Sequence, residues 1–365
     1  MTYLDKLLKD VVVDWKPLGD YTNYEQPTKY LVKSNVYNDA FETPVLTAGK
    51  TFILGYTDEI SGIYEASKKT VIIFDDFTTA NKWVDFDFKA KSSAMKMITS
   101  KDESTLLLKF VYYWLNTLPS ELVDADHKRH WISNYCNKLI PIPPLEIQQK
   151  IVDILDKFTE LTAELTAELT ARKQQYEYYR EQLLRFEGEE VDWRSLGEVY
   201  KFQYGTGNTI PTSGGDYPVY GSNGIVGSHS EYNSEDSPVI GHIGAYAGIV
   251  NYGKGKHFVT YNGVICKLIN EKVNPRYGYY QLINQDFNAL AKNSSQPFVS
   301  YKELNAVKIP IPSLAEQARI VTILDKFDTL TTSISEGLPK EIELRKKQYE
   351  YYRNMLLSFP KKETA

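Results

Sequence analysis

The chain of 365 residues contains only two cysteines, Cys136 and Cys266, and they lie far apart in the sequence. Two thiols placed in this way supply neither a disulfide framework nor a cysteine-based metal site. No apolar run approaches the roughly 20 residues needed to span a bilayer, and the first residues lack the basic and apolar regions of a signal peptide. These absences predict a cytoplasmic protein that does not enter a membrane.

Motifs for catalysis and cofactor binding are also missing. Residues 48–51, Ala-Gly-Lys-Thr, resemble the end of a phosphate-binding loop, but Pro44 stands where the first glycine is required. The glycines within 241–248 do not follow the dinucleotide-binding pattern, and the five histidines lack metal-ligand spacing. Asp75 and Asp76 would point to opposite faces of a strand, which argues against a shared acid–base site. The Asn-Pro-Pro-Tyr type of motif of an amino-methyltransferase is absent as well. The sequence therefore predicts no catalytic, cofactor or metal site in this chain.

Positive charge is not in excess either. The net charge is −5, residues 1–140 hold 17 Lys or Arg against 19 Asp or Glu, and residues 192–312 hold 10 against 9. Bulk electrostatic attraction would therefore not bring this protein to nucleic acid by itself. Local contacts, shape or partner subunits would have to supply the affinity.

What the sequence does contain is one unit that occurs twice. Residues 172–186, RKQQYEYYREQLLRF, return at 345–359 with eleven of fifteen positions identical. Three shorter segments recur in the same order: VDW at 13–15 and 191–193, IPIP at 140–143 and 309–312, and ILDKF at 154–158 and 323–327. The bodies between these segments, roughly 20–138 and 198–307, share little sequence. This internal repeat predicts two equivalent attachment points, which carry two bodies with different recognition surfaces.

Each body alternates strand-like runs with turns and then ends in a helix. In the first body, runs rich in β-branched and aromatic residues cover 43–56, 70–74 and 83–88, and a helix is expected within 102–118. The second body is richer in glycine, which favours short strands joined by tight turns, and a helix is expected over 276–291. A short amphipathic helix is also expected near the N-terminus.

From residue 145 the pattern becomes helical. Apolar residues recur at steps of three and four from Ile147 to Phe186, which is typical of a coiled-coil seam, and the preceding prolines mark the helix start. At about 1.5 Å per residue, residues 145–186 would form a rod of up to about 60 Å.

A second rod is expected from Ile320 to Phe359, interrupted by a kink or short break at Gly337 and Pro339. Each rod has an apolar stripe too long to bury against one body. The two rods would therefore pack on each other, antiparallel, with the bodies at opposite ends. The alternative is that the rods join two chains.

The sequence thus predicts an α+β fold of four regions. They are residues 1–143, a first body with its N-terminal helix; 144–187, a helical region; 188–312, a second body; and 313–365, a second helical region. The two bodies of mixed strands and helices would be separated by two long helices, packed as an antiparallel coiled coil with pseudo-twofold symmetry.

Polar side chains suited to DNA occur in both bodies, because lysines meet phosphates while amides and hydroxyls pair with phosphates and base edges. Candidates in the first body are Lys50, Thr78, Thr79, Lys82, Lys89, Lys91, Ser92 and Ser93. Candidates in the second body are Asn223, His242, Tyr246, Lys254, Lys256, Asn262, Ser294, Ser295 and Gln296.

The order of these segments strongly resembles the DNA-specificity subunit of type I restriction–modification enzymes. The likeness covers nearly the whole chain and rests on PLEIQQKIV at 144–152 with LDKF at 155–158, and on PSLAEQARIV at 312–321 with LDKF at 324–327. The resemblance implies two target-recognition domains, each reading half of a split double-stranded DNA site. The half-sites would lie roughly one to two DNA turns apart, at about 34–36 Å per turn. One departure is Gly241-His242-Ile243-Gly244, where many relatives carry an Arg-Lys pair.

The resemblance also implies partners. Two methyltransferase subunits and the restriction and translocase subunits would bind, and S-adenosylmethionine, ATP and Mg would be held by those partners, so this chain would be a non-catalytic subunit. The repeated segment would lock the helix pair and offer its flank to the methyltransferases, through Arg172, Lys173, Tyr176, Glu177, Arg180, Arg345, Lys346, Tyr349, Glu350 and Arg353. The alternatives are a scaffold without a DNA role and a fragment of a self-contained methyltransferase–nuclease.

Overall fold

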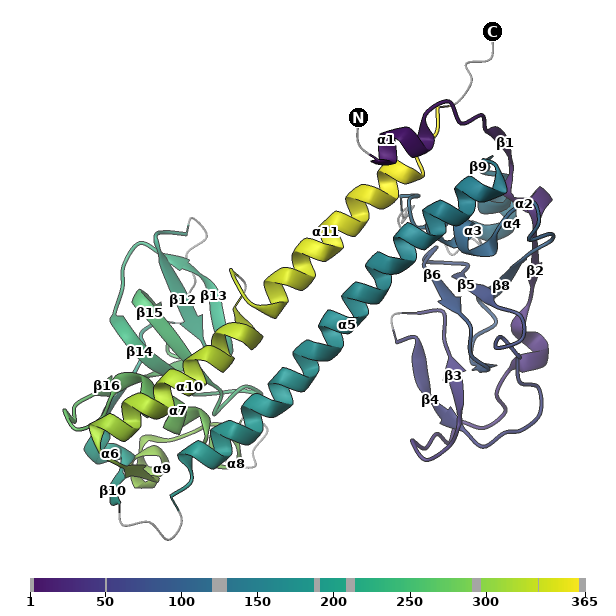
Figure 1. The fold of residues 1–365 in the computed structure, drawn as a ribbon. Helices are drawn as coiled ribbons and strands as arrows, with labels where there is room; N and C mark the ends of the chain where they lie inside the picture. Colours follow the sequence, from purple (N-terminus) through teal and green to yellow (C-terminus); the bar gives the residue numbers. More distant parts are fainter. Residues whose placement is uncertain are drawn as a thin grey trace. The chain divides into compact units, whose positions relative to one another are not determined.

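The computed structural model describes residues 3–49, 51–119, 130–186, 191–207, 214–290, 297–333 and 335–360. The chain divides into two compact units, Met1–Glu164 with Ile342–Ala365, and Leu165–Glu341 (Figure 1). Each unit contains one body and parts of both helical regions.

The first body is built on a four-stranded and a three-stranded sheet. The four-stranded sheet has the order β2-β8-β5-β6, formed by Thr22–Glu25, Met95–Ser100, Val71–Asp75 and Asn81–Val84. The three-stranded sheet has the order β4-β3-β7, formed by Ile53–Thr57, Thr43–Leu46 and Lys89–Ala90. The helices are α1 (Tyr3–Leu8), α2 (Leu18–Tyr21), η1 (Pro27–Tyr30), α3 (Leu108–Leu115), α4 (His130–Ser133) and η2 (Tyr135–Asn137).

Two of the strand-like runs are confirmed, and strands β2, β7 and β8 were not predicted. The run 43–56 contains β3 and β4, and the run 70–74 becomes β5, which is buried along its whole length. The run 83–88 is only partly a strand, since β6 ends at Val84. Strand β8 lacks a clear strand signal because its second residue is a lysine, Lys96, although that lysine is fully buried.

The second body is built on one six-stranded sheet with the order β11-β16-β14-β15-β12-β13. Its strands are Tyr200–Tyr204, Gly263–Leu268, Ser234–Gly241, Val250–Val259, Tyr217–Gly221 and Gly224–His229. Its helices are α6 (Leu196–Val199), α7 (Pro275–Ile283), α8 (Phe287–Leu290) and α9 (Tyr301–Ala306). The predicted helix over 276–291 is therefore two helices, because α7 ends before residue 284.

The recurring short segments close each body in the same way. Strand β1 (Asp14–Pro17) pairs with β9 (Leu139–Ile142), and β10 (Asp192–Ser195) pairs with β17 (Lys308–Ile311), both antiparallel. Trp15 lies opposite Pro141 in the first pair, and Trp193 lies opposite Pro310 in the second. The VDW and IPIP segments thus form the strand pair from which each long helix departs.

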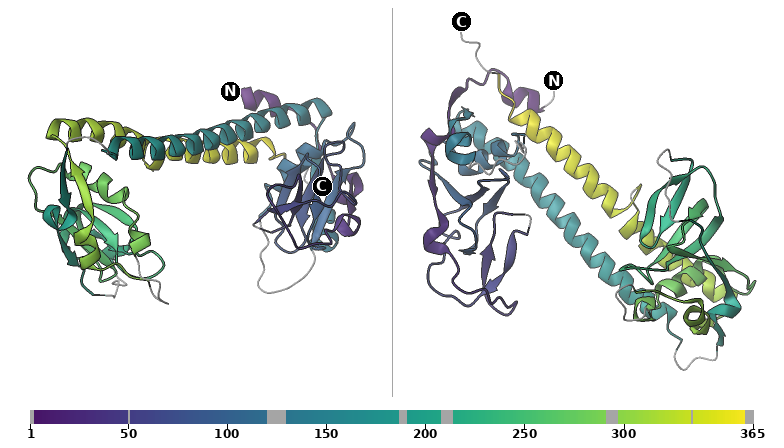
Figure 2. Two further views of the ribbon diagram at one scale, coloured as in Figure 1. Left: turned by 90° about the horizontal axis from the view of Figure 1, so that it is seen from below. Right: turned by 180° about the vertical axis from the view of Figure 1, so that it is seen from behind.

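The long helices are α5 (Leu145–Leu184), α10 (Leu314–Thr332) and α11 (Leu338–Leu356), seen from three sides in Figures 1 and 2. The predicted break at Gly337 is confirmed, because α10 and α11 are separate helices. In the first unit, Phe158 of α5 stacks on Tyr352 of α11 with ring centroids 5.3 Å apart. In the second unit, Tyr179 of α5 stacks on Phe327 of α10 at 5.6 Å.

These two stacks fix the direction of packing. Early residues of α5 contact late residues of the second helical region, and late residues of α5 contact its early part, so the pairing is antiparallel. The packing occurs within one chain, which confirms the prediction that the two helical regions pack on each other. Phe158 and Phe327 occupy the same position of the repeat, as do Tyr179 and Tyr352. The Phe158–Tyr352 and Phe327–Tyr179 stacks are therefore the same contact, in which the two helical regions exchange roles.

A fully buried histidine connects β14 and β15 inside the second body. The Nδ1 atom of His257 lies 2.8 Å from the Gly255 carbonyl oxygen, and its Nε2 atom lies 3.2 Å from Ser237 Oγ. Because a carbonyl oxygen only accepts, Nδ1 carries the proton and Nε2 accepts from the serine. Burial lowers the pKa of His257 below its ordinary value, so the folded state keeps this ring neutral.

Gly337 should not tolerate a side chain. Its φ is 82°, and a Cβ there would lie 2.4 Å from the Thr329 carbonyl oxygen. We expect Gly337→Ala to lower the free energy of unfolding by about 2 kcal/mol or more, since left-handed strain and a backbone clash add together. Gly255→Ala is the control, because its φ of 62° has open space around the added Cβ. Urea unfolding that gives equal losses for the two variants would contradict this account.

The buried imidazole should make stability depend on pH. An unfolded histidine takes up a proton near pH 6.5, whereas folded His257 does so only at lower pH. The unfolded state therefore binds more protons between those values, and stability should fall as pH is lowered from about 7.5 to 5.5. Thermal unfolding across this range tests the expectation, and a His257→Gln variant should show a flatter dependence. An equally steep fall in the variant would assign the effect to other groups.

Candidate nucleic-acid and partner interfaces

Both bodies gather candidate residues at the same corner of their sheets. In the first body, the turn after β5 carries Thr78 and Thr79, and the turn before β8 carries Ser92 and Ser93. One backbone hydrogen bond joins these turns, from Asp76 N to Ala94 O at 3.1 Å. We call residues 75–80, 91–95 and 130–131 the loop corner of the first body.

The second body repeats this arrangement with different side chains. His242 and Tyr246 follow β14, Asn262 precedes β16, and the bond from His242 N to Asn262 O is 2.8 Å long. A later segment returns to the same place in both bodies. His130 N donates to Asp76 O at 2.9 Å, and Val299 N donates to His242 O at 3.0 Å. The loop corner of the second body comprises residues 241–248, 260–263 and 297–301.

The first-body candidates differ in accessibility. Thr78, Lys82, Lys91 and Ser93 are exposed, Ser92 is half-buried, Thr79 is buried with a φ of 62°, and Lys50 lies outside the described residues. Lys82 lies on β6, the edge strand of its sheet. The ring of Tyr37 lies 6.0 Å from the ammonium of Lys91.

Lys89 corrects the expectation drawn from the sequence. Its side chain is buried, and its ammonium lies 3.1 Å from a Glu59 carboxylate oxygen and 2.6 Å from the Ser61 carbonyl oxygen. Because those contacts leave no free surface for a phosphate, Lys89 is not a candidate for a DNA contact. A lysine in a two-residue strand carries no sequence signal that distinguishes this burial from exposure.

The second-body candidates are not all brought together. Asn223, Tyr246, Lys254 and Lys256 are exposed, Asn262 is half-buried, and Ser294, Ser295 and Gln296 lie outside the described residues. Asn223 lies in the turn between β12 and β13, and Lys254 lies on β15. Lys256 pairs with Glu235 near the start of β14, whereas the loop corner follows its end. The ammonium of Lys256 lies 4.6 Å from the centre of the Tyr232 ring, and a hydrogen bond to that tyrosine raises its pKa.

His242 also differs from the expectation of a direct DNA contact, because it is buried. Its ring packs against Tyr204 at 4.3 Å and Tyr261 at 5.5 Å, and its Nδ1 lies 3.0 Å from the Val299 carbonyl oxygen. Tyr204 stacks in turn on Tyr301 at 3.9 Å. Burial raises the pKa of Tyr301 to about 12, so the hydroxyl of this tyrosine stays protonated at physiological pH.

Sequence reasoning missed this aromatic group. The chain has 28 tyrosines, so no single one stood out. The available signal was that Tyr261 directly precedes the nominated Asn262. Tyr261 and Tyr246 are the exposed aromatic residues of this corner.

Each body is anchored to its long helix by a buried glutamine. In the first unit, Gln148 Nε2 donates to the carbonyl oxygens of Pro143 and Thr105, both at 2.9 Å, and its Oε1 accepts from Leu107 N at 2.9 Å. In the second unit, Gln317 bonds to Pro312, Lys272 and Asn274 in the same way, at 2.8, 2.9 and 2.7 Å. Each amide thus ties the helix start to the strand before it and to its own body.

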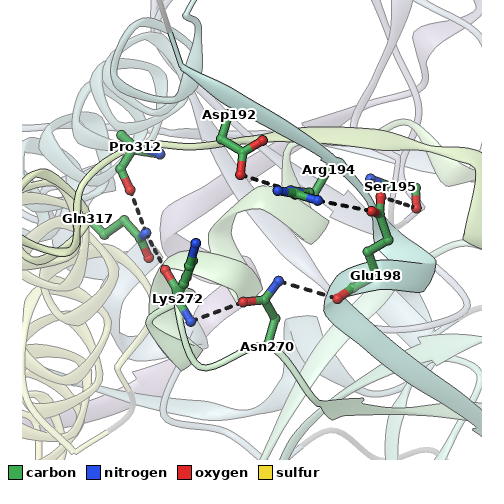
Figure 3. A network of polar contacts seen from close by, with 8 residues as sticks. All are labelled: Asp192, Arg194, Ser195, Glu198, Asn270, Lys272, Pro312 and Gln317. Atoms are coloured by element: carbon green, nitrogen blue, oxygen red, sulfur yellow. Dashed lines mark hydrogen bonds and ion pairs between the residues drawn. The ribbon is translucent and has the colours of Figure 1, made fainter.

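Figure 3 shows how the second anchor continues into the body. Lys272 N donates to Asn270 Oδ1 at 3.0 Å, and Asn270 Nδ2 donates to the Glu198 carbonyl oxygen at 3.4 Å. The Glu198 carboxylate accepts from Ser195 at the start of α6 and pairs with Arg194, which also binds Asp192. The helix start, the closing strand and the body therefore form one polar network.

A second anchor uses an aspartate eight residues after each glutamine, about two helical turns further along the helix. Asp156 accepts from the Tyr113 hydroxyl and pairs with Lys109 at 3.4 Å. Asp325 accepts from the Tyr280 hydroxyl at 2.5 Å and pairs with Arg276 at 2.7 Å. Burial, and then the hydrogen bond to the carboxylate, raise the pKa of both tyrosines. In both bodies the tyrosine follows the cation by four residues.

The repeated segments have equivalent local geometry in the two units. The Arg180 guanidinium lies 5.4 Å from the Tyr176 ring centre, and that of Arg353 lies 5.5 Å from Tyr349. Arg172 and Arg345 each donate from Nη1 to the glutamine three residues later, at 2.9 Å.

Only part of the nominated partner surface is open. Tyr176 is buried against Phe327, and Tyr349 is half-buried beside Tyr113, so these two rings belong to the packing within the chain. Lys173, Glu177, Lys346 and Glu350 are exposed. The most open aromatic residues here are Tyr178 and Tyr351, at 59% and 64% exposure, and they occupy the same repeat position.

Within the ranges given above, no three His, Cys, Asp or Glu side chains gather closely enough to hold a metal ion. Among the helices of those same ranges, none combines the length and apolarity needed to cross a bilayer.

Comparison with known proteins identifies the family. Residues 13–172 and 188–344 match the Type I restriction modification DNA specificity domain. The chain is 52% identical to the Escherichia coli type I restriction enzyme EcoR124I/EcoR124II specificity subunit, covering 100% of this chain and 99% of that one. It is 37% identical to the E. coli EcoprrI specificity subunit over 63% of each chain. The crystal structure of the S subunit from M. genitalium has the same fold, with a TM-score of 0.63 at 18% identity, over 99% of this chain and 100% of that one. The chain therefore belongs to the family of type I restriction–modification specificity subunits.

Proposed function

We propose that this subunit reads a split double-stranded DNA site, with one half-site per body, and has no catalytic activity of its own. The observation that carries this proposal is the pair of loop corners. They share one backbone hydrogen-bond pattern but present different side chains, which is what two readers of different sequences require. Such a role belongs in the cytoplasm, where bacterial DNA lies.

We further propose that two methyltransferase subunits bind, one at each copy of the repeated segment. A surface that occurs twice with equivalent geometry fits two identical partners. Restriction and translocase subunits would join this assembly, and S-adenosylmethionine, ATP and Mg would reside on the partner chains. The exposed charged residues beside Tyr178 and Tyr351 supply the polar rim that such an interface needs.

Exchanging one body should change one half of the DNA site. We expect a chain whose residues 20–138 are replaced by the body of another specificity subunit to alter one half-site and retain the other. The cognate methyltransferase subunit is co-expressed, and the methylated bases of the host DNA are sequenced. An undivided methylated site in the parent complex would sink the proposed function.

Two measurements separate the alternatives. Binding of S-adenosylmethionine by the isolated chain would favour the methyltransferase–nuclease fragment. Absence of sequence-specific DNA binding by the complex with the methyltransferase would favour a scaffold without a DNA role.

Removing the exposed tyrosines should weaken partner binding. We expect Tyr178→Ser and Tyr351→Ser each to weaken one methyltransferase site about tenfold or more, because exposed aromatic residues often anchor interfaces. The double variant should lose both partners, as measured by native mass spectrometry. Tyr246→Ser is the matched control, since it removes an exposed tyrosine from the loop corner of the second body. Equal loss of assembly in the control would remove the repeated segment from this role.

A further inference from the structure

Asp76 holds three segments of the first loop corner together. Its N–H donates to Ala94 O at 3.1 Å, and its carbonyl oxygen accepts from His130 N at 2.9 Å. Its Oδ1 atom accepts from Trp131 N at 2.8 Å. The side chain therefore doubles the backbone contact to the segment that returns at residue 130.

A buried lysine balances the charge of this carboxylate. Lys96 Nζ lies 3.2 Å from Asp76 Oδ2, and the two side chains are 0% and 1% exposed. A buried ion pair is weak evidence for stability, because apolar residues of similar size often serve equally well. Asp76 belongs to the turn that carries Thr78, and Lys96 lies in β8 just after the turn that carries Ser92, so the ion pair joins the two turns.

His242 occupies the equivalent place in the second body with different chemistry. It too bonds to the neighbouring turn and to the returning segment through its backbone. Its side chain again adds a bond to the returning segment, since Nδ1 donates to the Val299 carbonyl oxygen at 3.0 Å. In one body a carboxylate accepts a hydrogen bond from the returning segment, and in the other an imidazole donates one to it. Both bonds hold the returning segment against its loop corner.

We propose that Asp76 and His242 are positioning residues for DNA specificity, each of which holds the returning segment against the exposed turns of its own loop corner. This inference rests on the proposed function. Asp76 and His242 act by positioning neighbouring residues, because their own side chains are buried and do not reach DNA. Loss of the side-chain bond should relax recognition of one half-site while leaving the other half-site unaffected.

A matched pair of double variants separates the hydrogen bond from the charge. Asp76→Asn with Lys96→Met removes both charges but keeps an amide oxygen for Trp131 N. Asp76→Leu with Lys96→Met removes both charges and the acceptor. Each variant is tested as the complex with the cognate methyltransferase subunit, and its methylated sites are compared with those of the parent. The body exchange assigns the half-site that belongs to the first body.

We expect the asparagine double variant to retain the discrimination of the parent at that half-site. The leucine double variant should lose at least tenfold in discrimination there, with the second half-site unchanged. Discrimination equal to the parent in the leucine variant, or an equal loss in both variants, would overturn the inference. A split site in the parent complex establishes the proposed function separately from either result.

The second body provides an independent arm if the leucine double variant does not fold. His242→Asn keeps an N–H donor near the position of Nδ1 for the Val299 carbonyl oxygen, whereas His242→Leu does not. We expect His242→Leu alone to relax the other half-site at least tenfold. Equal methylation patterns for the two His242 variants would contradict the proposal in this body.

Discussion

One buried amide at the start of each long helix is the constraint on which the rest of the structure depends. Gln148 and Gln317 each satisfy carbonyl and N–H groups from two segments that would otherwise be buried without partners. Leaving such groups unsatisfied costs about 1–3 kcal/mol each. The amide therefore determines how the helix leaves the closing strand pair, and the aspartate anchors at Asp156 and Asp325 then fix the rotation of the helix against its body.

Constant and variable parts of the chain perform separate physical tasks. The constant parts are strand pairs, helix starts and aromatic stacks, whose geometry recurs in both units. The variable parts are the loop corners, where a shared backbone pattern holds an ion pair in one body and an aromatic group in the other. Recognition can therefore change without disturbing the contacts that maintain the fold.

The sequence predicted the features that repeat and missed those that depend on tertiary burial. Both helical regions and the break at Gly337 were predicted because these features have local signals, whereas the pairing of the VDW and IPIP segments as strands was not predicted. The same reasoning placed Lys89 on the surface and did not detect β8, since a lysine gives no local sign that a carboxylate will meet it in the interior. It nominated His242 as a contact, but the packing of Tyr204 and Tyr261 around it follows from strand pairing between distant segments.

The aspartate anchors have a consequence for how such a protein can change over time. The acceptor, Asp156 or Asp325, belongs to the repeated helix, whereas the cation, Lys109 or Arg276, is supplied by the body. Because both helices present the same carboxylate, a newly acquired body needs to bring only a cation and a tyrosine one helical turn later to engage this anchor. Each helical region therefore offers the same anchoring site, and bodies of different sequence can bind to it.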